Sequence, residues 1–166
     1  TIHFNYFMGD QLINIKYRDG RKNFKLYKGA EKVFYNINSV VGYDWCVLVE
    51  GEMDVLALHE AGIKNVISVP NGATLNSNNL DYLDNCIDYL DDKTKIILAV
   101  DADEAGQALK QELIRRLGAE VCYLVDFNGQ KDANEYLTVN GAKKLRGAIH
   151  TAKQVPLEGV TTLYDI

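Results

Sequence analysis

The pattern of apolar and polar positions changes near residue 45. Beyond that point, short apolar runs predict four buried strands, at residues 46–50, 66–69, 95–100 and 121–125. The segments between and after these runs have helical periodicity, at residues 54–61, 79–91, 104–117, 131–137 and 142–153. Because strands that alternate with helices form parallel sheets with right-handed crossovers, the pattern predicts an α/β fold.

The residues before this point have a β-rich pattern instead. Residues 11–17 alternate between polar and apolar, Asp19 and Gly20 favour a tight hairpin turn, and residues 23–27 suit a return strand. A further turn and strand are expected around residues 34–36. We therefore expect three parts: a small β-rich N-terminal subdomain, an α/β domain and an exposed linker, at residues 1–43, 44–153 and 154–166.

The charge is unevenly distributed between these parts. The chain of 166 residues has a net charge of −5, but residues 1–40 contain seven Lys or Arg against three Asp or Glu, so they carry +4 and the remainder carries −9. A basic arm beside an acidic body suits nucleic-acid binding, although a solvated basic hairpin would give the same pattern. No apolar stretch approaches the ~20 residues of a membrane span and no secretory signal is visible, so we expect a cytoplasmic protein without a membrane partner.

Carboxylates directly follow two of the predicted strands. Glu50 comes after the first, and Asp101 and Asp103 come after the third, while Asp54 lies in the first turn of a predicted helix, where capping and metal binding are both open. Because the carboxyl ends of parallel strands meet at one edge, we expect these four side chains to gather there. Carboxylates that close repel one another unless they are protonated or bridged by a cation, and oxygen-only ligands suit Mg²⁺ or Mn²⁺. The sequence therefore predicts magnesium-dependent phosphate chemistry.

Polar residues near these carboxylates are candidates for supporting roles. Gly51 allows a ligand phosphate to approach the backbone closely, whereas Glu52 is expected to point elsewhere. After the fourth strand, Asp132 could be another metal ligand, Lys131 a phosphate contact, and Asn134 a capping or hydrogen-bonding group. The sequence contains no P-loop, no dinucleotide fingerprint and no nucleophile elbow, which argues against those classes of enzyme.

Together these motifs resemble the TOPRIM domain, the catalytic module of primases and topoisomerases. The segments VEGEMD at residues 49–54 and DADEAG at residues 101–106 match its two acidic motifs, and the second has the form found in primases. Other segments are similar to phage primase–helicases and their Twinkle-like relatives, at residues 17–25, 69–73, 131–135 and 156–162. The resemblance implies a TOPRIM-like parallel sheet flanked by helices, and the RNA-polymerase core of a phage-type primase–helicase.

The resemblance also implies a role for each matched residue. The catalytic group would be Glu50, Asp101 and Asp103, with Glu50 as a metal ligand or general base. The ligands of Mg²⁺ (or Mn²⁺) would be Glu50, Asp54, Asp101, Asp103 and Asp132. The contacts to nucleotide or nucleic acid would be Arg21, Lys22, Lys25, Gly51, Lys131 and Asn134. The implied partners are a single-stranded DNA template, ribonucleoside triphosphates and a replicative helicase domain of the same parent chain.

Three functions stay open at this point. The first is metal-dependent synthesis of short RNA primers on single-stranded DNA during replication. The second is a TOPRIM nuclease or topoisomerase-like module, which would use the same metals and which a cleavage assay would separate from a primase. The third is a non-catalytic module that keeps the fold and binds single strands. A receiver-like phosphoacceptor domain would explain acids at strand ends, but not the basic N-terminal hairpin.

Overall fold

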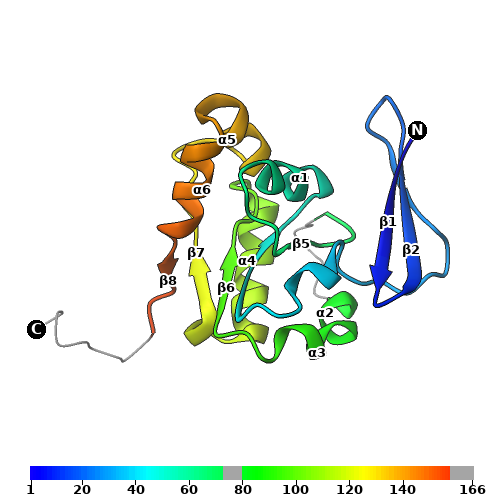
Figure 1. Ribbon diagram of the computed structural model, residues 1–166, viewed down its shortest axis with the longest axis horizontal. Coiled ribbons are helices and arrows are strands. Elements are labelled where there is room, and N and C mark those ends of the chain that lie inside the picture. Colours follow the sequence, from blue (N-terminus) through cyan, green and yellow to red (C-terminus); the bar gives the residue numbers. More distant parts are fainter. Residues whose placement is uncertain (73–79, 158–166) are drawn as a thin grey trace, which may run out of the picture.

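The computed structural model describes residues 1–72 and 80–157 and has a central sheet flanked by helices (Figure 1). The strand order of this five-stranded sheet is β5-β4-β6-β7-β8. The four parallel strands are β4 (Trp45–Val49), β5 (Val66–Ser68), β6 (Lys95–Leu98) and β7 (Cys122–Leu124), and the antiparallel edge strand is β8 (Lys153–Gln154). This arrangement confirms the predicted α/β class.

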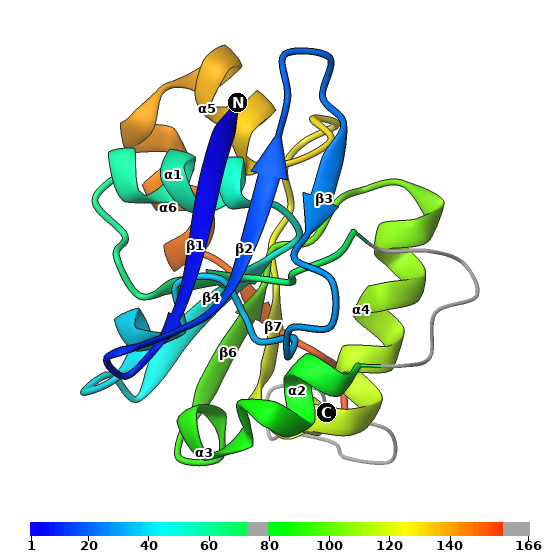
Figure 2. The same cartoon turned by 90° about the vertical axis from the view of Figure 1, so that its right-hand side faces the viewer.

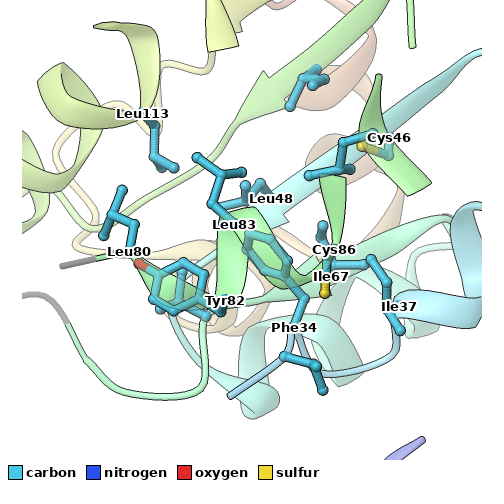
Figure 3. Packing of buried hydrophobic residues seen from close by; sticks show 14 of the residues in the cluster. Phe34, Ile37, Cys46, Leu48, Ile67, Leu80, Tyr82, Leu83, Cys86 and Leu113 are labelled. Carbon is cyan, nitrogen blue, oxygen red and sulfur yellow. The ribbon is translucent and has the colours of Figure 1, made fainter. Parts of the chain in front are cut away.

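The middle strands are buried on both faces, as their continuous apolar runs require. Successive residues of β4 alternate between two apolar clusters, so that Cys46 and Leu48 belong to one and Val47 and Val49 to the other. Figure 3 shows the first cluster, in which Leu48 and other sheet residues pack with Leu113. The sheet therefore packs through an apolar cluster on each of its two faces.

Different helices cover the two faces of the sheet. One layer contains α1 (Glu52–Glu60), α5 (Ala133–Asn140) and α6 (Ala142–His150), which contact one another. The other contains α2 (Asp81–Asn85), α3 (Ile87–Leu90) and α4 (Glu104–Leu117), whose apolar side chains join the first cluster. No helix among residues 1–72 and 80–157 is long and apolar enough to cross a membrane.

Two helix predictions need correction. The helix predicted at residues 79–91 is divided into α2 and α3, because Cys86 between them has φ −115° and ψ 11°; residue 79 lies outside the described residues. The helix predicted at residues 142–153 ends at His150, because Lys153 pairs with β7 as part of β8. The part of the predicted linker at residues 158–166 also lies outside the described residues.

The N-terminal residues form a separate antiparallel sheet of order β1-β2-β3, which Figure 2 shows in front of the parallel sheet. Its strands are β1 (Ile2–Met8), β2 (Gln11–Arg18) and β3 (Phe24–Leu26). The two strands expected on either side of Asp19 are present, whereas β1 was not predicted. Phe4 and Tyr6 of β1 enter the core cluster that covers the parallel sheet.

The strand expected around residues 34–36 is reduced to a bridge. Tyr35 exchanges two backbone hydrogen bonds with Ser68 at the end of β5, and the chain then enters the 3-10 helix η1 (Ile37–Val40). A second 3-10 turn, η2 (Ala119–Val121), precedes β7. The bridge at Tyr35 and the buried residues of β1 attach the N-terminal sheet to the parallel one.

Candidate metal and nucleotide site

The carboxyl ends of β4 and β6 bring the two acidic motifs together. These strands are parallel neighbours with Leu48 opposite Leu98, so Glu50 and Asp101 leave the sheet side by side. The Glu50 Oε1 atom accepts a hydrogen bond of 2.9 Å from the backbone N–H of Asp101. This contact fixes one acidic motif against the other.

The carboxylates form two triads that share one residue. Oxygen atoms of Glu50, Asp101 and Asp103 lie within 4.8 Å of one another, and so do oxygen atoms of Asp54, Asp101 and Asp132. Two overlapping groups of oxygens at this spacing can hold one or two hard divalent cations. The structure therefore brings together the five carboxylates that were predicted as metal ligands.

Asp101 has an oxygen atom that lacks a partner among the described residues. Its Oδ1 atom is buried and accepts no hydrogen bond there, while its Oδ2 atom lies 3.7 Å from the ammonium of Lys131. A buried oxygen without a hydrogen bond is costly unless an ion or a water molecule satisfies it. The donor set therefore fits a divalent cation at the place where the triads meet.

Burial and crowding make these carboxyl groups harder to ionise. Burial raises the pKa of Asp54 to about 7, with the charge of Asp132 adding to the rise and the backbone N–H of Asn134 opposing it. Burial and then the charge of Asp132 raise the pKa of Asp101 to about 6, while the Lys131 ammonium opposes this rise. A bound cation would favour the ionised form of both groups.

Three of the carboxylates are held in place by helix N-termini. Asp103 caps α4 by accepting from the N–H of Gly106 at 2.8 Å, and Asp132 caps α5 in the same way. Asp54 was open to capping or metal binding. Its Oδ1 atom accepts from the N–H of Asn134 at 3.0 Å, so it caps α5 and not its own helix, and it also belongs to a triad.

Gly106 allows the close packing of the two motifs. A Cβ atom at this position would lie 2.1 Å from the backbone oxygen of Asp101 and 2.7 Å from Glu50 Oε1. Real side chains do not approach so closely, so only glycine fits between these groups without displacing them. Gly106 was quoted as part of the second motif, but the sequence alone did not show this packing role.

A cavity of about 360 Å³ lies between the carboxylates and the N-terminal sheet. Its walls are formed by Lys16, Phe24, Lys25, Leu26, Glu50, Gly51, Glu52, Asp54, Pro70, Asn71, Gly72 and Asp101. Lys25 and Gly51 line this cavity, and the Lys131 ammonium lies within 4 Å of Asp101 and Asp103. Arg21 and Lys22 are exposed and are not among the described residues that line the cavity.

Sequence reasoning missed Lys16 and Phe24 as members of this cavity. Both lie on the strands flanking the Asp19 turn, and the Lys16 ammonium is 5.0 Å from the centre of the Phe24 ring. The basic and aromatic content of this segment was a signal, but only the docked sheet shows which of its residues line the cavity.

A family model described as Toprim-like matches residues 47–137. The chain belongs to the Toprim-like family. The matched range begins in β4 and ends in α5, so it contains all five carboxylates of the triads. The predicted resemblance to TOPRIM proteins is thereby confirmed.

The relatives of this Toprim-like chain include proteins named as primases or primase homologs. It is 38% identical to the primase homolog protein of Arabidopsis thaliana over 95% of the chain, and 34% identical to the chloroplastic/mitochondrial Twinkle homolog protein of the same plant over 99%. It spans 52% of the first relative and 26% of the second. The crystal structure of the primase fragment of the bacteriophage T7 primase-helicase matches with a TM-score of 0.74 and 26% identity, over 87% of this chain and 60% of that one. Most of this Toprim-like chain is thus similar to a part of each of these longer proteins.

Proposed function

We propose that this Toprim-like chain is a DNA-directed RNA polymerase that synthesises short RNA primers on single-stranded DNA. The observation that carries the proposal is the pair of carboxylate triads sharing Asp101, placed opposite a basic sheet across one cavity. The relation to primases supports the same conclusion. Nucleotidyl transfer needs such a site, because the reaction is helped chiefly by positioning and by neutralising phosphate charge.

Each side chain of the site has a task in this reaction. Mg²⁺ or Mn²⁺ bound to the triads would neutralise negative charge on the triphosphate and would assist the attack by the primer 3′-hydroxyl. Asp103 and Asp132 keep their positions through their helix caps, and Glu50 serves as a ligand or general base. The ammonium groups of Lys131 and Lys25 bind phosphate oxygens, and the backbone at Gly51 leaves room for them.

The proposed partners follow from the charge of the molecule. The proposed site for a ribonucleoside triphosphate is the cavity beside the carboxylates, and the proposed site for a single-stranded DNA template is the basic N-terminal part, where residues 1–40 carry +4. A helicase domain in the parent chain is supported by the likeness to the T7 primase fragment, which is part of a primase-helicase protein. The expected cytoplasmic location stays a prediction, since the name of the Twinkle homolog places that relative in chloroplasts and mitochondria.

The test is magnesium-dependent incorporation of ribonucleotides on single-stranded DNA that carries an annealed di- or trinucleotide primer. We expect the wild type to extend the primer, and Glu50→Gln and Asp101→Asn each to reduce the rate by at least about 100-fold. Asp88→Asn is the matched control, because it makes the same change at an exposed position of α3. Cleavage of the strand without extension would instead indicate a TOPRIM nuclease.

A further inference from the structure

A lysine of the N-terminal sheet is buried at the wall of the cavity. Lys16 is only 7% exposed, and lysine is rarely buried to this extent without a charged partner. Its partner is Glu52, which is 3% exposed and lies in the first turn of α1. The Lys16 Nζ atom is 2.9 Å from Glu52 Oε1 and 3.2 Å from Oε2. The pair connects the N-terminal sheet to the start of the helix that follows Glu50.

Glu52 is held by a second donor from the same sheet. The hydroxyl of Tyr6, whose side chain is fully buried, donates a hydrogen bond to Glu52 Oε1. The ring of Tyr35 packs edge-on against that of Tyr6, with 5.3 Å between their centres. The Glu52 carboxylate is therefore fixed by β1 and β2 together, and it is in neither of the metal-binding triads.

Stability alone is a poor explanation for this buried pair. Taking two charges out of water costs free energy, and apolar side chains of similar volume often stabilise a protein as well or better. The position of the pair offers another explanation, because Lys16 lines the cavity together with Glu50 and Asp101. A lysine here without a fixed partner would be attracted to those carboxylates and would compete with a cation for them.

We propose that Glu52 is a positioning residue that holds the Lys16 ammonium at the cavity wall, where this ammonium contacts a phosphate group of the bound nucleoside triphosphate. This inference rests on the proposed function. An ammonium has three N–H groups, and Lys16 Nζ contacts two oxygens of Glu52, so one N–H group remains for a phosphate oxygen. The Phe24 ring, 5.0 Å from Lys16 Nζ, restricts the lysine on another side.

The test compares Glu52→Gln, Lys16→Met and the double variant in two assays: calorimetric binding of ATP with MgCl₂, and primer extension. We expect each single variant to weaken ATP binding and to raise the KM for ATP roughly tenfold, with kcat changed less than about twofold, because one charged hydrogen bond is lost. Thermal unfolding is measured for each variant, since a single change leaves one buried charge unpaired.

The double variant distinguishes positioning from a structural role. It leaves no unpaired charge, so we expect it to recover thermal stability relative to the single variants while its KM for ATP stays high. Recovery of both stability and KM would show that the pair is only structural and would overturn the proposal. Unchanged ATP binding in Glu52→Gln, or no ATP binding by the wild type at millimolar concentration, would overturn it as well.

A control exists at Lys93, a second buried lysine among the described residues, whose partner Asp92 lies at the surface. Lys93 has a side chain that is 2% exposed and pairs with Asp92 at 2.8 Å, away from the residues that line the cavity. We expect Asp92→Asn to leave the KM for ATP unchanged. A further outcome separates the two proposals. If Glu52→Gln weakens ATP binding but the wild type does not extend primers, the proposed polymerase activity is refuted and the positioning role is not.

Discussion

Asp101 and Asp54 each lower the stability of the folded protein when their carboxyl groups are ionised. The pKa of Asp54 is raised to about 7 and that of Asp101 to about 6, against about 3.9 for an aspartate in an unfolded chain. Between these values the folded chain binds more protons than the unfolded chain, so both groups lower the stability as the pH rises through this window. Above it the loss is complete unless a cation binds.

Replacing Asp54 by asparagine should therefore stabilise the cation-free protein. We expect Asp54→Asn to raise the free energy of unfolding in EDTA at pH 8 by roughly 1–3 kcal/mol, and to have little effect at pH 4, where the wild-type carboxyl is protonated. The asparagine oxygen can still accept from the N–H of Asn134. Urea denaturation at both pH values measures the effect, with Asp88→Asn as the exposed control. Equal gains at both pH values would contradict it.

At the scale of elements, the sequence predicted those parts that have a strong local pattern. The buried strands β4 and β6 follow from continuous apolar runs, and α4 follows from its periodic apolar stripe. The strand β8 was missed because two exposed residues, Lys153 and Gln154, carry no pattern of their own. In β1 the exposed Phe7 obscures the alternation of the buried Phe4 and Tyr6.

The junction of β4, β6 and α4 depends on Gly106, and its substitution tests how tightly these elements meet. We expect Gly106→Ala to destabilise the fold by about 1–3 kcal/mol, because its Cβ would overlap the Asp101 backbone and the Glu50 carboxylate. Binding of Mn²⁺, followed by electron paramagnetic resonance, should weaken at the same time. Gly147→Ala is the control: its Cβ would meet nothing within 4 Å in α6, so this change should be neutral or slightly stabilising. Unchanged Mn²⁺ binding in Gly106→Ala would contradict this account.

At the scale of the whole molecule, the site is formed between two separate sheets, β1-β2-β3 and β5-β4-β6-β7-β8. The parallel sheet provides the carboxylates and the N-terminal sheet provides Lys16, Phe24 and Lys25. Sequence patterns could place the carboxylates, since parallel strand ends meet by rule. They could not pair Lys16 with Glu52, because 36 residues separate them and only the docked sheet brings them together.

The exposed part of the basic sheet should bind the polynucleotide and not the nucleotide. Arg21 and Lys22 lie in the turn between β2 and β3, outside the cavity lining, so the double variant Arg21→Gln/Lys22→Asn should weaken binding of single-stranded DNA and leave ATP binding unchanged. Asparagine is chosen because Lys22 has φ 63°, which asparagine tolerates. Loss of two phosphate contacts should reduce the slope of log affinity against log salt by about 1.4.

Fluorescence anisotropy of a labelled oligonucleotide at several salt concentrations measures this slope. The matched control is Lys143→Gln/Lys144→Gln, which removes two positive charges from the exposed side of α6. Both double variants change the net charge equally. If DNA binding depended only on the net charge of the protein, both variants would therefore weaken it to a similar degree. A reduced slope confined to the Arg21 and Lys22 variant would place the DNA backbone along the N-terminal sheet, whereas equal slopes would exclude a local contact there.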